Sequence, residues 1–149
     1  MITDIAKQPS LILLGQCSFT CRILKNLIEQ SHTPSFIAIE GEEADRDPFE
    51  GLIINCKPEW FVEHMFYHHN WKEVTRALCK EHSIPYLFKK EVIDSLPVHD
   101  ILIVAGYSKK IPKFLLDTYN KWAINIHPSM LPMFKGPQPE AQIILNSAN

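Results

Sequence analysis

Short apolar runs alternate with stretches of helical spacing along most of the chain, and this alternation restricts the fold more than any other feature. The first run, Ser10–Gly15, suits a strand that is buried on both faces. Apolar residues then recur at helical spacing over Ser18–Gln30, with Ser18 as the expected N-cap, and a second strand-like run follows at Phe36–Ile39. A strand, a helix and a strand in this order predict a β-α-β unit with parallel strands and a right-handed crossover.

The alternation continues through the rest of the chain. Further strands are expected at Leu52–Cys56, Ile84–Phe88, Asp100–Ala105 and Trp122–Ile126, and further helices at Lys72–His82, Lys113–Tyr119 and from Pro139 to Leu145. The acidic segment Gly41–Asp47 is typical of a surface loop, and Trp60–Tyr67 is rich in aromatic residues. Strands that alternate with helices over the whole length predict an α/β fold with a mostly parallel sheet.

Length and charge exclude several classes of protein. A chain of 149 residues suits one globular domain, and 15 Lys and Arg against 17 Asp and Glu give a net charge of −2. A surface devoted to nucleic acid or to an anionic membrane is therefore not expected. The longest apolar runs are too short to span a bilayer and the first ten residues lack a secretory pattern, so we expect a cytoplasmic protein with no membrane partner.

The four cysteines do not follow the spacing of a typical metal site. They are Cys17, Cys21, Cys56 and Cys79, and no two of them form a C-x-x-C pair. Cys17 and Cys21 would share one face of a helix and could be ligands, but small buried thiols in a reduced compartment are the simpler interpretation. We therefore expect no metal.

Two of the predicted strands end in residues suited to chemistry. In an open α/β sheet, ligands bind beyond the carboxyl ends of the strands. One strand ends in Ala105-Gly106-Tyr107, where the glycine permits a sharp turn or a close approach of backbone to a ligand. The next strand runs into the segment Asn125–Pro132, which contains a histidine between polar and proline residues.

Asn125 and His127 are two positions apart, so on a strand both side chains would project to one side while Ile126 points into the packing of the sheet. Pro128 keeps His127 out of the helical region, and together with Pro132 it stiffens the loop. An amide beside an imidazole can hydrogen-bond a developing oxyanion while the imidazole holds or moves a proton. The alternative is a polar strand end that merely caps the sheet.

The segments Val104–Tyr107, Asn125–Pro132 and Phe134–Gly136 together resemble the formyltetrahydrofolate-dependent formyltransferases. The family block is N-x-H-P-S-L-L-P-x-[FY]-R-G, and here Met130 replaces one leucine and Lys135 replaces the arginine. The resemblance implies a Rossmann-like, doubly wound and mostly parallel sheet, and 10-formyltetrahydrofolate as the co-substrate.

The resemblance also implies a role for each matching residue. Asn125 and His127 match the catalytic pair that flanks the formyl carbon and holds the tetrahedral oxyanion when an amine attacks. The folate site would be lined by the backbone of Ala105, Gly106 and Tyr107 and shaped by the rigid loop of Ser129, Leu131 and Pro132, where the family often places a cis-proline. Lys135 and Gly136 match the approach to the amine substrate, where Lys135 could meet a phosphate; the alternative is that Lys135 is simply exposed.

One element of the family pattern is missing from the sequence. The third catalytic residue of the family is an aspartate in a loop after the helix that here begins near Pro139, and no acidic residue of this sequence stands in that context. We therefore expect residues 1–149 to be the N-terminal part of a formyltransferase catalytic domain without the portion that carries the aspartate. Proton transfer from the attacking amine should suffer, so we expect little or no turnover from these residues alone.

The acceptor is the least determined part of the prediction. The segment Gly15–Cys21 lacks the glycine-rich phosphate loop of the glycinamide ribonucleotide enzymes, which favours another small amine such as an amino sugar nucleotide. The alternatives are a methionyl-tRNA formyltransferase, a formyltetrahydrofolate hydrolase and a non-catalytic folate-binding module. The expected partners are thus folate and a small amine, with nucleic acid only if the acceptor is tRNA, and a homodimer is a possible assembly.

Overall fold

The computed structural model describes residues 8–41, 70–119, 122–136 and 139–147. Its five strands are β1 (Leu11–Gly15), β2 (Phe36–Glu40), β3 (Tyr86–Lys89), β4 (Ile101–Ala105) and β5 (Trp122–Ile126). They form one sheet in the order β3-β2-β1-β4-β5, and every neighbouring pair is parallel. The predicted α/β fold with a parallel sheet is therefore confirmed. The expected strand Leu52–Cys56 and the aromatic stretch Trp60–Tyr67 lie outside the described residues.

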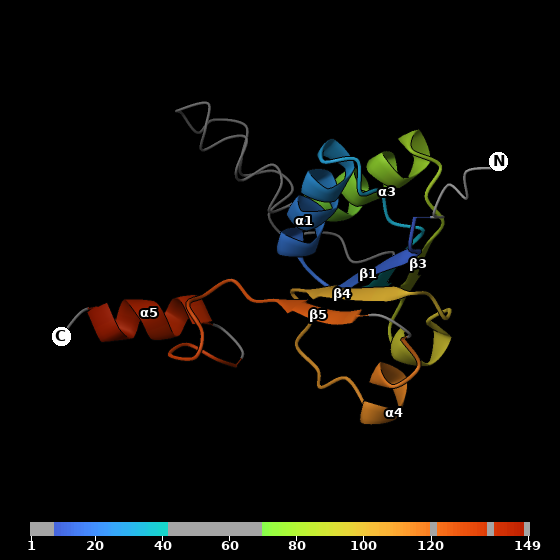
Figure 1. Cartoon of the computed structure of the whole chain (residues 1–149). Coiled ribbons are helices and arrows are strands. Elements are labelled where there is room, and N and C mark those ends of the chain that lie inside the picture. The colour runs from blue at the N-terminus through green and yellow to red at the C-terminus, as the bar shows by residue number, and fades with distance from the viewer. Residues whose placement is uncertain (1–7, 42–69, 120–121, 137–138, 148–149) are drawn as a thin grey trace, which may run out of the picture.

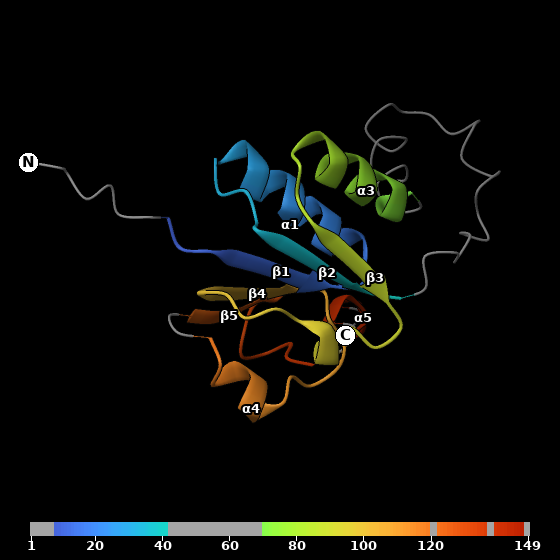
Figure 2. The same ribbon diagram turned by 90° about the vertical axis from the view of Figure 1, so that its right-hand side faces the viewer.

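Helices cover both faces of the sheet, as expected for a doubly wound fold (Figures 1 and 2). Helices α1 (Ser18–Glu29) and α3 (Trp71–Glu81) lie on one face, while α4 (Lys113–Leu116) and the 3-10 turn Ile93–Ser95 lie on the other. Helix α5 (Pro139–Ser147) lies beyond the carboxyl edge of the sheet, away from both layers (Figure 1). None of the helices in the described ranges is long and apolar enough to cross a membrane.

The core consists of two layers, because alternate residues of each strand face opposite sides of the sheet. Leu13 and Ile37 are fully buried under α1 and α3, whereas Ile12 and Leu14 are fully buried on the side of α4. The β1 strand pairs with β2 on one edge and with β4 on the other, in a register that sets Leu11 opposite Ile101. Its five residues are all buried, as predicted for the first apolar run.

Several predicted element ends differ from the structure, and at three of them a local hydrogen bond explains the difference. The N-cap of α1 is Cys17 rather than Ser18, since the Cys17 N–H donates to the hydroxyl of Thr20 at 3.4 Å. Strand β3 does not include Ile84, whose N–H donates to the Cys79 carbonyl at the end of α3 over 2.7 Å. Helix α4 does not reach Tyr119, because the chain tightens into three-residue turns after Leu116.

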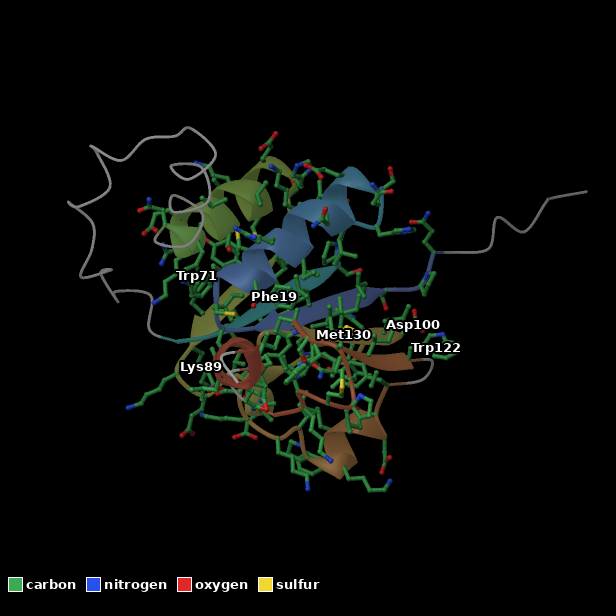
Figure 3. The ribbon with its side chains drawn as sticks, turned by 90° about the vertical axis from the view of Figure 1, so that its left-hand side faces the viewer. Phe19, Trp71, Lys89, Asp100, Trp122 and Met130 are labelled. Atoms are coloured by element: carbon green, nitrogen blue, oxygen red, sulfur yellow. The ribbon has the colours of Figure 1, made fainter. Side chains whose placement is uncertain are left out.

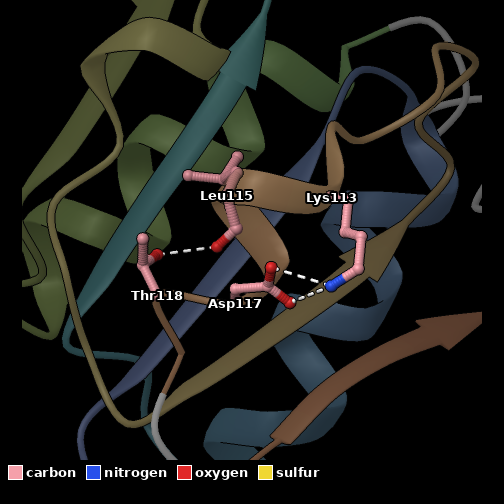
Figure 4. Close-up of polar contacts among 4 residues, drawn as sticks. All are labelled: Lys113, Leu115, Asp117 and Thr118. Carbon is pink, nitrogen blue, oxygen red and sulfur yellow. Dashed lines mark hydrogen bonds and ion pairs between the residues drawn. The ribbon is translucent and has the colours of Figure 1, made fainter.

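Helix α4 is a single turn held by one buried and one exposed contact (Figure 4). Leu115 is buried against the sheet, and its carbonyl accepts a hydrogen bond of 2.6 Å from the Thr118 hydroxyl. On the exposed side, Lys113 donates to both oxygens of Asp117 at 2.8 Å. Both side chains of this ion pair are exposed to solvent, so its contribution to stability is small.

The ends of β1 and β4 approach each other closely at the start of α1. The Thr20 hydroxyl, which is 1% exposed as a residue, donates a hydrogen bond of 2.6 Å to the Ala105 carbonyl. A Cβ at residue 15 would overlap both the Thr20 side chain and that carbonyl, so only glycine fits there. The connection between β1 and α1 therefore touches the end of β4 directly.

We expect Gly15→Ala to lower the free energy of unfolding by about 3 kcal/mol, because the added methyl group forces backbone and side-chain shifts in a filled core. Chemical denaturation of the purified chain would measure the loss. Gly136→Ala is the matched control: its φ is +103°, but a Cβ there meets no atom within 4 Å, so only the backbone strain of about 1 kcal/mol is expected. Equal losses in the two variants would contradict the crowding at Gly15.

Two thiols lie between α1 and α3, as expected for buried cysteines. Cys21 and Cys79 are 0% and 1% exposed, and burial together with repulsion from Cys21 raises the pKa of Cys79 to about 12. Cys17 differs from the expectation, because it is only half-buried and lies at the carboxyl edge of the sheet. A thiol whose folded pKa is raised keeps its proton in the native state while the unfolded chain loses it.

The stability of the native state should therefore fall as the pH rises from about 9, where an unfolded thiol ionises, toward 12, where Cys79 does. The full contribution of one such proton is about 1.4 kcal/mol per pH unit. In Cys79→Ala, the unfolding free energy should decline less steeply between pH 9 and pH 11, by up to the slope that one proton contributes. Parallel pH profiles for the two proteins would show that Cys79 does not carry this dependence.

Candidate active site

The residues predicted to carry chemistry follow the carboxyl ends of β4 and β5, as expected for an open parallel sheet. In Figure 3, Lys89 marks the carboxyl end of β3, whereas Asp100 and Trp122 mark the amino ends of β4 and β5. The sheet changes winding direction between β1 and β4, since the chain passes from β1 to β2 on one side and returns to β4 on the other. The loops after these two strands therefore flank the position where such folds bind ligands.

The end of β5 presents Asn125 and His127 on either side of a packed residue. Ile126 is half-buried against the cluster beneath α1 and α3, so the pleat directs the neighbouring positions 125 and 127 to the face of α4. Asn125 lies opposite Val104 in the register and is exposed, while His127, just beyond the strand, is half-buried. An accessible amide and a sheltered imidazole are thus placed at the same strand end.

Hydrogen bonds fix the ring of His127 at both nitrogens. Nδ1 lies 2.7 Å from the Ser129 hydroxyl, and that hydroxyl donates to the Phe134 carbonyl at 2.8 Å. Because the single proton of Ser129 is directed at a carbonyl, Nδ1 must be the donor to Ser129. Nε2 lies 3.2 Å from the Gly136 carbonyl, which can only accept.

Both ring nitrogens of His127 therefore face acceptors. A ring that satisfies both contacts carries two protons, whereas a neutral ring with its proton on Nδ1 has a lone pair on Nε2. In the first form Nε2 can donate a hydrogen bond to a developing oxyanion, and in the second it can accept a proton from an attacking group. The arrangement suits His127 to either half of an acyl-transfer step.

The loop after His127 is folded back on the ring. The Leu131–Pro132 peptide bond is cis, as the family resemblance implied, and the Phe134 N–H reaches the Met130 carbonyl at 3.4 Å. The side chains of Leu131 and Met133 are 57% and 66% exposed, so the loop presents apolar surface beside the imidazole. Lys135 and Gly136 are exposed at its end, where a second molecule could approach.

The loop after β4 is held against the loop after β1. Gly106 has a φ of +67°, and its carbonyl lies 3.5 Å from the Sγ of Cys17. The side-chain amide of Gln16 donates to the hydroxyl of Ser108 at 2.9 Å, which joins the two loops across the change in winding direction. Ala105 is fully buried, so of the three predicted folate-lining residues in this loop Gly106 and Tyr107 are the accessible ones.

A cluster at the ends of β2 and β4 was not predicted from the sequence. The carboxylate of Glu40, 9% exposed, accepts a hydrogen bond of 2.7 Å from the Tyr107 hydroxyl and lies 2.8 Å from the Lys109 ammonium. Burial and the neighbouring carboxylate raise the pKa of Tyr107, and the hydrogen bond to Glu40 raises the pKa of Lys109. The available signal was an acidic residue closing an apolar strand at the carboxyl edge of the sheet.

Within the described part of the chain, no three His, Cys, Asp or Glu side chains gather closely enough to hold a metal ion. The groups that the site does present are an amide, an imidazole, hydroxyls and a carboxylate. These groups suit acyl transfer, in which a tetrahedral oxyanion must be held and a proton moved.

Comparison with known protein families gives a match over most of the chain. A family model described as formyl transferase covers residues 11–149. The methionyl-tRNA formyltransferase of Geobacter sulfurreducens is 27% identical over 143 residues, which cover 91% of this chain and 39% of that protein. The methionyl-tRNA formyltransferase of Orientia tsutsugamushi is 45% identical over 47 residues, 32% of this chain and 15% of that protein. The chain thus spans well under half the length of these relatives.

Solved structures with the same fold include two phosphoribosylglycinamide formyltransferases. The enzyme from Bacillus halodurans superposes with a TM-score of 0.56 at 18% identity, over 92% of this chain and 65% of that structure. The enzyme from Streptococcus pneumoniae gives 0.58 at 14% identity, over 95% and 68%. At identities this low, the superpositions speak for the fold alone, and they confirm the Rossmann-like architecture.

The contacts of His127 predict how the ring responds when its partner is removed. Ser129→Ala deletes the acceptor of the Nδ1 proton, so the proton should no longer be confined to Nδ1 and stability should fall by about 1 kcal/mol. Nitrogen-15 NMR of the histidine rings measures the tautomer directly. Ser108→Ala, which loses a hydroxyl bonded to Gln16 instead, should leave the His127 signals in place. Identical His127 signals in wild type and Ser129→Ala would contradict the assignment.

Proposed function

The chain belongs to the formyl transferase family, and on that premise we propose that it transfers a formyl group from 10-formyltetrahydrofolate to a primary amine. The observation that carries the proposal is the imidazole of His127, held by Ser129 and Gly136 at the strand end that also exposes Asn125. A fixed imidazole beside a free amide is what transfer through an oxyanion requires.

The proposed reaction begins when the lone pair of the amine attacks the formyl carbon, so that the carbonyl oxygen becomes an oxyanion. The side-chain amide of Asn125 and the protonated Nε2 of His127 donate hydrogen bonds to that oxygen. Collapse of the intermediate breaks the bond between the formyl carbon and N10 of the folate. As N10 leaves, it takes the Nε2 proton of His127, and the neutral ring then accepts the proton that the newly formylated amine gives up.

The folate would lie between the two loops that follow β4 and β5. The backbone of Gly106 and Tyr107 and the loop of Ser129, Leu131 and Pro132 are the residues that we assign to its pocket. Two features support this fit: Gly106 has no side chain to block approach, and Leu131 presents exposed apolar surface to a planar ring. Ala105 is buried, so it would support the pocket from the core side. The Ser129 hydroxyl is bonded to the ring of His127, so Ser129 would shape the pocket by holding that ring.

Two classes of amine are candidates for the acceptor. The net charge of −2 supports a small amine such as an amino sugar nucleotide, because a chain with this charge has no broad basic surface for nucleic acid. Methionyl-tRNA is supported by the names of the matched relatives. In either case the exposed Lys135 and Gly136 lie where the acceptor would approach, and Lys135 could pair with a phosphate.

We place the reaction in the cytoplasm, which is where the free thiols are expected to stay reduced.

We expect Asn125→Ala and His127→Ala to reduce formyl transfer by about 100-fold to 1,000-fold each, because each removes a donor to the oxyanion. The assay measures formylated amine formed by the natural protein in its full length, with both candidate acceptors tested in turn. Asn26→Ala and His82→Ala are the matched controls, since these exposed residues lie on α1 and at the end of α3 and should leave the rate unchanged. Normal turnover in a folded His127→Ala protein would overturn its role.

The same assay separates the remaining functions. Formate released equally fast with and without amine would identify a formyltetrahydrofolate hydrolase, in which water is the acceptor. Folate binding without turnover in the full-length protein would identify a folate-binding module. Transfer to one amine alone identifies the acceptor class.

A further inference from the structure

We propose that Glu40 is a positioning residue, which holds the loop after β4 in the shape that receives the folate. The inference rests on the proposed function, because it takes Gly106 and Tyr107 as part of the folate pocket. Glu40 itself lies at the end of a different strand, β2, and acts only through the two side chains that it holds.

The carboxylate of Glu40 uses both of its oxygens on the loop after β4. Oε2 accepts the 2.7 Å hydrogen bond from the Tyr107 hydroxyl, and Oε1 takes the 2.8 Å ion pair with the Lys109 ammonium. With only 9% of its side chain exposed, the carboxylate depends on these two partners, because a buried charge is costly unless it is paired. The two contacts therefore stabilise one conformation of the loop.

The position of Glu40 allows it to reach this loop across another strand. In the strand order, β1 lies between β2 and β4, so the contacts from Glu40 to residues 107 and 109 extend past the end of β1. Alternation along β2 places Glu40 on the same face as Ala38, which is buried in the layer that Tyr107 also packs against. Tyr107 is thus fixed at its hydroxyl by Glu40 and at its ring by the core.

The other contacts of the loop are weaker. Gly106 lets the chain turn at a φ of +67°, and beyond it the neighbouring loop offers the long thiol contact of Cys17 and the neutral, exposed bond between Gln16 and Ser108. Hydrogen bonds to a charged group are about twice as strong as neutral ones. Of the contacts described for this loop, those of Glu40 therefore contribute most to its position.

Loss of these contacts should weaken folate binding more than it slows chemistry. Residues 106 and 107 are assigned to the folate pocket, whereas Asn125 lies on β5 and His127 just beyond it, where Ser129 and Gly136 hold the imidazole. In Glu40→Gln one carboxylate oxygen becomes an NH2 group, which donates but cannot accept, so only one of Tyr107 and Lys109 keeps an oxygen partner and the negative charge is lost. A loop that samples several conformations binds its ligand more weakly, in proportion to the time spent in the competent one.

The experiment titrates 5-formyltetrahydrofolate, a stable isomer of the co-substrate, into the natural protein in its full length and into its variants by calorimetry. We expect about tenfold weaker binding for Glu40→Gln and about threefold for Tyr107→Phe or Lys109→Met, each of which removes one of the two contacts. Lys113→Met is the matched control, because it deletes another 2.8 Å ion pair on α4, outside the loop (Figure 4), and should bind as wild type.

A double variant and hydrogen exchange separate positioning from direct contact and from general loss of stability. If Lys109 acts through Glu40, the Glu40→Gln/Lys109→Met double variant should bind as Glu40→Gln alone does. Amide exchange should accelerate at residues 106–109 and stay unchanged at residues 125–127. Equal acceleration in both segments, or additive losses in the double variant, would overturn the inference.

The possible failures are distinguishable. Wild type that binds no folate would overturn the proposed function, whereas tight binding by both wild type and Glu40→Gln would overturn only the role of Glu40. If Glu40→Gln does not fold, Tyr107→Phe and Lys109→Met carry the test, since both retain Glu40 and one of its partners. Wild-type affinity in both of those variants would contradict the inference.

Discussion

The hydrogen bond from the Thr20 hydroxyl to the Ala105 carbonyl is the contact on which the carboxyl edge of the sheet depends. It is buried and 2.6 Å long, and it joins the first turn of α1 to the last residue of β4 over 85 positions of sequence. Gly15 makes it possible, because any Cβ there would occupy the same space. The loop after β4 consequently begins from a fixed point, from which its next residues meet Gln16 and Cys17 just after β1 and Glu40 at the end of β2.

The sequence was sufficient for the elements whose pattern is local. The strand Trp122–Ile126 and the start of α5 at Pro139 have the predicted bounds, and the parallel order followed from the alternation of strands and helices. Two of the bounds that differ come from single hydrogen bonds. Thr20 moves the N-cap of α1 to Cys17, and the end of α3 takes the N–H of Ile84 away from β3. Periodicity cannot show which of two partners an N–H will choose, because both choices fit the same apolar pattern.

The candidate site likewise contains residues that the sequence could predict and residues that it could not. Asn125 and His127 could be predicted because they are neighbours on one strand and belong to a recognisable block of sequence. Glu40 could not, since its two partners lie 67 and 69 positions away, and only the order of the strands brings them together. The same holds for the bond between Gln16 and Ser108, which spans 92 positions. Even for Ser129, the sequence placed the residue near the site but not the direction of its hydroxyl, which the carbonyl of Phe134 decides.

The pairing of β1 with β4 also determines how long β1 lacks a partner strand during synthesis. Leu11 lies opposite Ile101, so the middle strand of the sheet leaves the ribosome about 90 residues before one of its two neighbours. At translation rates of roughly 5–20 residues per second, that interval is on the order of 5–20 seconds. Throughout it, a nascent unit of β1, α1 and β2 would have Ile12 and Leu14 without the strand and layer that later cover them. An emerging chain of this topology is a natural client for chaperones that shield apolar surface until the partner strand arrives.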